Sequence, residues 1–211
     1  GLIPCGSGNG LGRHLGIRPA EQAFQTLLDG QPLAIDTGMV NTDPFFCVAG
    51  TGFEALIASR FATLTSRGFS GYLRTSFQAW RTYRPERYTI HHSQGRDSVE
   101  AFTLAISNSS QYGNNAYIAP GASMSDGLLD VTAVPRVGLH NGIPLVWRLF
   151  NGSLNRVATV RRYQGDKFVV ERERPGWIHT DGEPRAEVSR LEITVRTRSL
   201  RIMVPAGTAT A

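Results

Sequence analysis

The sequence predicts an α+β fold, in which a mainly antiparallel β-sandwich with a few helices follows the C-terminal stub of an α/β unit. A glycine-rich start leads into one amphipathic helix, and the second half of the chain contains strand-like segments at short spacing. We place the boundaries so that residues 1–30 form the stub, 31–205 the sandwich domain and 206–211 a tail.

The first predicted helix follows the opening glycines. In RPAEQAFQTLLDGQP the apolar residues recur at helical spacing, Pro19 stands near the start and Gly30 stands beyond the end. The period then changes to that of a strand in LAIDTGMV, and residues 41–44 form a turn before the apolar strand FFCVAG. This part of the chain therefore reads as helix, strand, turn and strand.

The middle of the chain contains two further helical patterns, GTGFEALIASRFATL and GYLRTSFQAWRTYRP, and Pro85 ends the second. Strands are predicted for RYTIHH and VEAFTLAISNSS, and the apolar run in the latter suits a strand buried on both faces. A loop rich in turn residues then leads into the strand LLDVTAV.

The last third begins with a helix in IPLVWRLFNG, for which we expect Pro144 in the first turn and Gly152 at the end. The remaining strand-like segments are VATVRRY, KFVVERE, GWIHTDGEP, RLEITVR and LRIMV. Their short spacing is typical of an antiparallel sandwich or barrel.

The composition of the chain indicates which partners and cellular settings to expect. The chain has a formal net charge of +5, and Lys167 is its single lysine. Arginines bind phosphates and carboxylates through a planar fork, but they are scattered here without an aromatic ladder, so we do not expect nucleic acid as a partner. No apolar run approaches the length of a membrane span. The two cysteines, Cys5 and Cys47, have no metal-ligand spacing, and the simplest setting is a reduced cytoplasm.

Three short motifs could carry chemistry. The first is the opening loop, in which Gly6 and Gly8 begin no G-x-G-x-x-G pattern and no Gly-Lys-Ser/Thr follows. Such a turn before a helix from Asn9 or Gly10 can still point backbone N–H groups at an anion, and Ser7 and Asn9 could add side-chain donors. A purely structural turn is the alternative.

The second motif is Asp126-Gly127-Leu128, in the loop before a strand. A carboxylate at a turn with free carbonyls around it can hold a hard cation such as Mg²⁺, whereas an Asx turn that only starts the strand is the simpler interpretation. The third motif is HTDGEP. Its Asp181 and Glu183 could act as a general base and its acidic partner, but Asp-Gly is also a common hairpin signal.

Read together and in this order, the motifs are more specific than any one alone. The segments IPCGSGNGLGRHLGI, VAGTGFEALIA, NSSQYGNNAYIAPGASMSDGLLDVTAV and HTDGEP resemble the family of diacylglycerol kinases, sphingosine kinases and bacterial lipid kinases. The resemblance covers residues 3 to about 205 and corresponds to the C-terminal two-thirds of the catalytic region. It implies an α/β ATP-binding domain, a β-sandwich domain and Mg²⁺-dependent phosphoryl transfer to a lipid hydroxyl in the cleft between them.

The resemblance also implies site residues. The nucleotide loop would be Gly6, Ser7, Gly8 and Asn9, with Ser7 in place of the usual threonine. Glu183 would be the catalytic base and Asp181 its acidic neighbour. A structural Mg²⁺ would be held by Asp126 with the main-chain carbonyls of Ser123 and Leu128.

Two positions depart from the family pattern. Gly10 stands where many relatives have aspartate, as in the sphingosine-kinase-like version, and Glu54 stands where aspartate is common. The first departure weakens any assignment of diacylglycerol as the acceptor. We assign no role to Glu54.

The cofactors and partners expected from this resemblance are ATP, Mg²⁺ and a lipid at the inner face of a membrane, visited transiently; whether the protein forms a homodimer is left open. The family's Gly-Gly-Asp-Gly-Thr loop is absent from the sequence, so we expect residues 1–211 alone to have little ATP affinity and no turnover. Two alternatives remain: a kinase of a soluble acceptor, as in the distantly similar NAD kinases, and a non-catalytic module that binds lipid or a partner.

Overall fold

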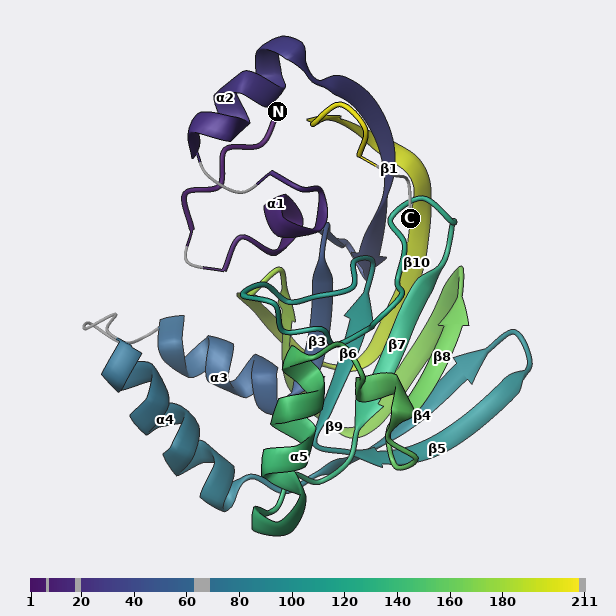
Figure 1. Cartoon of the computed structure of the whole chain (residues 1–211). Helices are drawn as coiled ribbons and strands as arrows, with labels where there is room; N and C mark the ends of the chain where they lie inside the picture. The colour runs from purple at the N-terminus through teal and green to yellow at the C-terminus, as the bar shows by residue number, and fades with distance from the viewer. Residues whose placement is uncertain (7, 18–19, 63–68, 209–211) are drawn as a thin grey trace.

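An antiparallel sheet of ten strands forms the centre of the computed structural model, which describes residues 1–6, 8–17, 20–62 and 69–208 (Figure 1). Eight strands follow the order β2-β1-β10-β9-β3-β6-β7-β8, and β4 pairs with both β9 and β5. Their bounds are β1 Gln31–Val40, β2 Asp43–Phe45, β3 Val48–Gly52, β4 Glu86–His92, β5 Gly95–Ala101, β6 Thr103–Ser107, β7 Leu129–Val134, β8 Arg161–Gly165, β9 Lys167–Thr180 and β10 Glu183–Val204.

The sheet divides at β9. One edge of this long strand pairs with β10, while its other edge pairs first with β4, through residues 169–172, and then with β3, through residues 178–180. Because two strands share one edge, the chain encloses a core rather than extending as a single open sheet. The predicted fold, a mainly antiparallel sandwich with a few helices, is confirmed.

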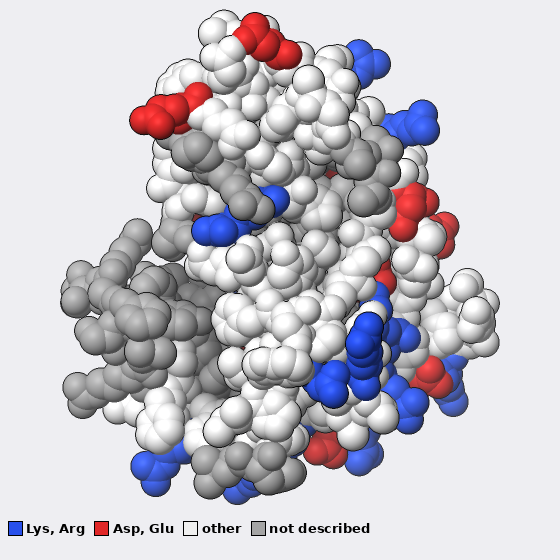
Figure 2. Space-filling view, in the orientation of Figure 1, with Lys and Arg blue, Asp and Glu red and all other residues white. Residues whose placement is uncertain are grey.

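In the described ranges, five α-helices and one 3₁₀ helix accompany the strands: α1 Gly10–His14, α2 Ala20–Asp29, α3 Phe53–Ala62, α4 Phe69–Thr82, α5 Leu139–Phe150 and η1 Leu154–Arg156. No helix of the described chain is long and apolar enough to cross a bilayer. On the face shown in Figure 2, basic side chains gather where η1 and the start of β8 lie, and the neighbouring surface where α5 lies is largely uncharged.

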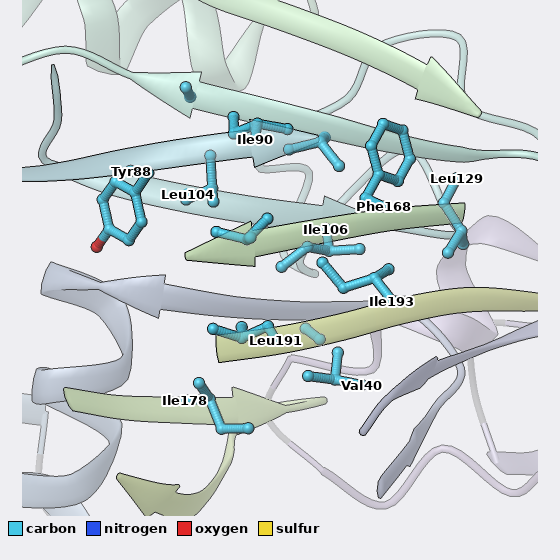
Figure 3. Close-up of a cluster of buried hydrophobic side chains, with 14 of the residues drawn as sticks. Val40, Tyr88, Ile90, Leu104, Ile106, Leu129, Phe168, Ile178, Leu191 and Ile193 are labelled. Atoms are coloured by element: carbon cyan, nitrogen blue, oxygen red, sulfur yellow. The ribbon is translucent and has the colours of Figure 1, made fainter. Parts of the chain in front are cut away.

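The main core contains large apolar side chains from β2, β4, β6, β7, β9 and β10 (Figure 3). Phe45, Tyr88, Leu104, Phe168 and Ile193 are all fully buried there. A second cluster lies beneath α5, and a third joins α1 and α2 to the far ends of β1 and β10. Burial of this apolar surface is the main favourable term in folding.

Residues on both sides of position 31 share the third cluster. Ile17 and Ala23 pack there with Ile35 and Val204, and Figure 1 shows β1 and β10 continuing from the main sheet to α1 and α2. The boundary at residue 31 therefore stays a prediction about domain organisation rather than a visible gap in the packing.

Several element predictions need correction. Residues 46–47 of the expected strand FFCVAG form the turn between β2 and β3, and in VATVRRY the strand β8 begins only at Arg161. The strand expected across residues 99–110 is broken at Phe102, so that β5 is mostly exposed and only β6 is buried on both faces. The helix α5 begins four residues before Ile143, because the Asn141 side chain accepts the Gly138 N–H at 2.6 Å and caps the start. Pro144 therefore lies inside the helix, while Gly152 does follow its end.

A buried arginine holds the strands around β9 together. The guanidinium of Arg172 donates to the carbonyls of Val188, at 2.7 Å, and Gly176, and to the hydroxyl of Thr51; the carboxylate of Glu86 lies 3.7 Å away. These contacts satisfy carbonyls where the β9–β10 register shifts. A buried charge is tolerated only with such partners.

We expect Arg172→Met to lower the free energy of unfolding by about 2–4 kcal/mol, because carbonyls that now accept from the guanidinium would be left without a donor. Urea unfolding followed by circular dichroism measures this. The control is Arg174→Met, an exposed arginine in the same strand, which should change stability by less than about 0.5 kcal/mol. Equal effects of the two substitutions would contradict the role given to Arg172.

Candidate active site

A cleft of about 1230 Å³ lies between the N-terminal loop and the helices α3 and α5. Its lining brings together segments that are far apart in the sequence: residues 2–6, 8–12, 46–48, 53–54, 57–58, 62, 112–114, 116, 149–150, 179 and 181–184. Two of the three predicted motifs, the opening loop and HTDGEP, therefore line one cleft.

The opening loop is tied to the loop that follows β6. Asn9 has a left-handed backbone with φ 47° and forms a β-bridge with Gly113. The carbonyl of Gly8 accepts the backbone N–H of Asn114 at 3.3 Å and the Nε–H of Arg13 at 3.2 Å. Gly6, Gly8 and Asn9 line the cleft, as the nucleotide-loop prediction requires, whereas Ser7 lies outside the described residues.

The structure gives a steric reason for the first departure from the family pattern. A Cβ at position 10 would lie 2.6 Å from the carbonyl oxygen of Tyr112, closer than a carbon can approach without a backbone shift. Gly10 is therefore required by the way the two loops pack. An aspartate at this position would need a different spacing between them.

The carboxylate of Asp181 is held by backbone donors. Its Oδ2 accepts the N–H of Phe46 at 2.7 Å, and its Oδ1 accepts those of Cys47 at 2.7 Å and Val48 at 3.1 Å. The N–H of Asp181 in turn donates to the carbonyl of Val48 at 2.9 Å. These bonds fix the Asp-Gly turn between β9 and β10 against the turn between β2 and β3, so the hairpin interpretation is correct for the backbone.

Glu183 differs from Asp181 in its surroundings. It is exposed, lines the cleft, and begins β10 opposite Thr180. Within the described part of the chain, no hydrogen bond or ion pair occupies its carboxylate. Of the two acidic residues of the motif, Glu183 is thus the one free to accept a proton.

A histidine and a glutamate meet behind the turn. The Nε2 of His179 lies 3.5 Å from the Oε1 of Glu54, and its Nδ1 accepts the N–H of Gly182 at 3.3 Å. Both side chains are largely buried. Gly50 makes room for the pair, since a Cβ there would lie 2.0 Å from the Glu54 oxygen. Glu54, to which the sequence assigned no role, supports the residue beside the Asp-Gly turn.

The third motif lies apart from the cleft, whose described lining includes no residue of this loop. The Oδ1 of Asp126 accepts the N–H of Leu128 at 3.0 Å, which is the Asx turn considered as the simpler interpretation. Ser123 lies two residues before Ser125, and its Oγ accepts the N–H of Ser125 at 3.2 Å. Among the described residues no three His, Cys, Asp or Glu side chains cluster as metal ligands.

The loop around Asp126 is anchored by a buried aspartate that sequence reasoning missed. Asp36 is 1 % exposed, and its carboxylate accepts the N–H groups of Gly127 and Arg198, each at 2.7 Å. The signal was present: Asp36 is the single charge in the apolar strand LAIDTGMV. His179 belongs to the motif HTDGEP, but Glu54 lies in α3, so only the tertiary structure shows the contact between them.

The environment of Asp181 affects the neighbouring thiol. Burial, and then the negative charge of Asp181, raise the pKa of Cys47 to about 12. Thiolate is the reactive form, so the raised pKa keeps Cys47 protonated and unreactive at pH 8. Cys5 is exposed.

We expect iodoacetamide at pH 8 to alkylate Cys5 rapidly in the native protein and to leave Cys47 unmodified until the chain unfolds, because the Cys47 thiol is buried and protonated. Peptide mass spectrometry with and without urea measures both sites. Equal labelling rates of the two cysteines under native conditions would contradict the packing around Asp181.

Substitution of the two acidic residues of the motif should affect stability to different extents. Asp181→Asn places an amide NH₂ against backbone donors and should lower the free energy of unfolding by about 1–3 kcal/mol. Glu183 has no side-chain partner within the described ranges, so Glu183→Gln should change the free energy of unfolding by less than about 0.5 kcal/mol. Thermal or urea unfolding compares the pair. A stability loss in Glu183→Gln that matched Asp181→Asn would show that Glu183 is also structural.

Comparisons with known proteins identify the family of this chain. Residues 47–204 match the family model described as YegS C-terminal NAD kinase beta sandwich-like domain. The chain is 28 % identical, over 98 % of its length and 68 % of the relative's, to a Pseudomonas aeruginosa protein named "Probable lipid kinase YegS-like". It is 28 % identical, over 97 % of its length and 69 % of the relative's, to a protein of Mycobacterium tuberculosis named "Diacylglycerol kinase".

The fold is also that of a solved structure. A crystal structure of a diacylglycerol kinase from Bacillus anthracis str. Sterne superposes with a TM-score of 0.74, covering 98 % of this chain and 69 % of that one, at 19 % identity. The expected resemblance is confirmed by the family match and the named relatives. The chain therefore belongs to the family of the YegS C-terminal β-sandwich domain, whose relatives named here are lipid and diacylglycerol kinases.

Proposed function

We propose that the protein carrying this chain is an ATP- and Mg²⁺-dependent kinase that transfers the γ-phosphoryl group to a lipid hydroxyl. The observation that carries the proposal is the carboxylate of Glu183, which has no partner among the described residues and shares the cleft with the anchored Asp181 and with the loop of Gly6, Gly8 and Asn9. Membership of a kinase family supports ATP as the phosphoryl donor.

The lining of the cleft supports a lipid acceptor. Apolar side chains form much of it, including Phe46, Phe53, Ile57, Leu149 and Phe150. An acyl chain loses unfavourable contact with water on such a surface, whereas a sugar or nucleotide acceptor would need polar partners. The lipid's hydroxyl would then meet the polar end of the cleft, where Asp181 and Glu183 lie.

In the proposed reaction the acceptor oxygen attacks the γ-phosphorus, the bond from phosphorus to the β–γ bridging oxygen breaks, and Glu183 takes the hydroxyl proton. Phosphoryl transfer depends mainly on positioning and on neutralising charge. The opening loop would contribute backbone donors to the phosphates, and Asp181 would keep the Asp-Gly-Glu turn in place through the N–H groups of Phe46, Cys47 and Val48.

The loop of Asp126 supports a structural Mg²⁺ by its donor chemistry. The residues inferred for it, Asp126 with the carbonyls of Ser123 and Leu128, supply only oxygen, which is the ligand class that Mg²⁺ prefers. Asp126 is exposed, and Asp36 fixes the loop from beneath. The ion would supply charge neutralisation and rigidity to this loop.

The test is an assay of the full-length protein with radiolabelled ATP, Mg²⁺ and a panel of diacylglycerol, a sphingoid base and soluble acceptors including NAD. We expect phosphate transfer to a lipid, and Glu183→Gln should lower kcat about 10²- to 10⁴-fold, because the base that accepts the hydroxyl proton is lost. The control is Glu100→Gln, an exposed glutamate in β5 outside the cleft lining.

Three results would contradict the proposal in distinct ways. Transfer only to a soluble acceptor would replace the lipid by that acceptor. Equal turnover by the wild type and Glu183→Gln would remove Glu183 from the reaction. Lipid binding without phosphate transfer to any acceptor would favour the non-catalytic module.

A further inference from the structure

Helix α5 carries an apolar stripe on its outer face. Ile143 is 81 % exposed, Val146 50 %, Trp147 63 % and Phe150 51 %. These four positions follow the i, i+3, i+4, i+7 spacing that places residues along one side of a helix. The opposite side is packed, since Leu145 is buried in the cluster beneath the helix. The helix therefore has two apolar sides, and only one of them is covered by the described chain.

The stripe is continuous with the candidate active site. Phe150, its last member, and the adjacent Leu149 line the cleft that contains Glu183. A surface that covered the stripe would therefore also lie at the edge of the cleft.

The charged residues in the stretch of sequence that contains α5 are all arginines. Between Asp130 and Asp166 the sequence contains five arginines, Arg136, Arg148, Arg156, Arg161 and Arg162, and no acidic residue. Three of them are exposed: Arg136 just before the helix, Arg156 in η1, which packs against α5, and Arg161 at the start of β8. Figure 2 shows basic side chains gathered where η1 and β8 lie, beside the uncharged surface where α5 lies. Arg162 is paired with Asp130 at 2.9 Å.

We propose that α5 is the membrane-docking element of this protein, with the stripe of Ile143, Val146, Trp147 and Phe150 inserted among the lipids of an anionic bilayer and Arg136, Arg156 and Arg161 over its headgroups. A helix with an exposed apolar face, a tryptophan on that face and basic residues beside it binds in the plane of an interface. The positive charge selects anionic lipid.

Docking in this way gives the proposed lipid acceptor a short route. The cleft edge at Leu149 and Phe150 would rest at the bilayer surface, so an acyl chain could remain among lipids while its polar end approached Glu183. This route for the acceptor rests on the proposed lipid-kinase function. The docking itself rests only on the exposed stripe and the arginines, and it is measured without ATP.

The experiment is co-sedimentation of the 211-residue chain with vesicles of phosphatidylcholine alone and with about 30 % phosphatidylglycerol. We expect binding to the anionic vesicles that weakens as salt is raised, because headgroup attraction is screened. Ile143→Ser with Trp147→Ser should weaken binding at least about tenfold. The matched control, Phe24→Ser with Leu28→Ser on α2, removes side chains of 57 % and 80 % exposure and should leave binding unchanged.

The charged part has its own pair of variants. Arg156→Gln with Arg161→Gln should weaken binding to anionic vesicles about 25-fold, at about fivefold per arginine. Arg196→Gln with Arg201→Gln, two exposed arginines of β10, lowers the net charge equally and should have little effect.

Equal losses from the α5 and α2 variants would overturn the assignment of α5, as would binding that is indifferent to phosphatidylglycerol and salt. Absence of vesicle binding, together with self-association in analytical ultracentrifugation that Trp147→Ser abolishes, would instead show that the stripe contacts a second copy. Because none of these measurements needs turnover, docking can fail while lipid phosphorylation is observed, and docking can hold while phosphorylation fails.

Discussion

Three backbone N–H groups that converge on the carboxylate of Asp181 determine the arrangement of the cleft. They come from the turn between β2 and β3, while Asp181 belongs to the turn between β9 and β10, so the bonds join two turns more than 130 residues apart. Hydrogen bonds to an ionised acceptor are about twice as strong as neutral ones. Glu183 lies two residues further along the chain, at the start of β10 and opposite Thr180.

Two charged side chains that are buried, unlike Asp181, organise the backbone elsewhere in the protein. Asp36 fixes the Asp126 loop through two backbone N–H groups, and Arg172 satisfies carbonyls where the β9–β10 pairing is irregular. In each case a charged side chain supplies the hydrogen-bond partner that a backbone group in an irregular segment lacks within the regular sheet. Asp36 fixes the conformation of the Asp126 loop, and Asp181 fixes that of the β2–β3 turn, which lines the cleft.

The Asp-Gly-Glu motif shows how neighbouring residues of one chemical type acquire different roles. Both oxygens of Asp181 are engaged by backbone donors, and Glu183, exposed at the start of β10, has a free carboxylate in the described chain. The helix α5 shows the same separation on its two sides, with Leu145 in the core and Trp147 exposed. The role of each of these side chains follows from its surroundings rather than from its residue type.

The sequence by itself determined most of the elements, because the spacing of apolar residues and the positions of glycines and prolines act locally. Thus LLDG and FEALIA indicate α2 and α3, and short alternating segments indicate the late strands. It also determined the family, because four motifs in a fixed order resemble it. Local pattern could not show that Asn141 starts α5 before Pro144, or that β5 and β6 separate at Phe102. Only the tertiary structure decided that Asp181 is an anchor, that Tyr112 excludes a side chain at Gly10, and that His179 meets Glu54. Those contacts join residues 102 to 135 positions apart, in strands, helices and loops whose pairing no local pattern shows. Of these residues the sequence marked Gly10, as a departure from the family pattern.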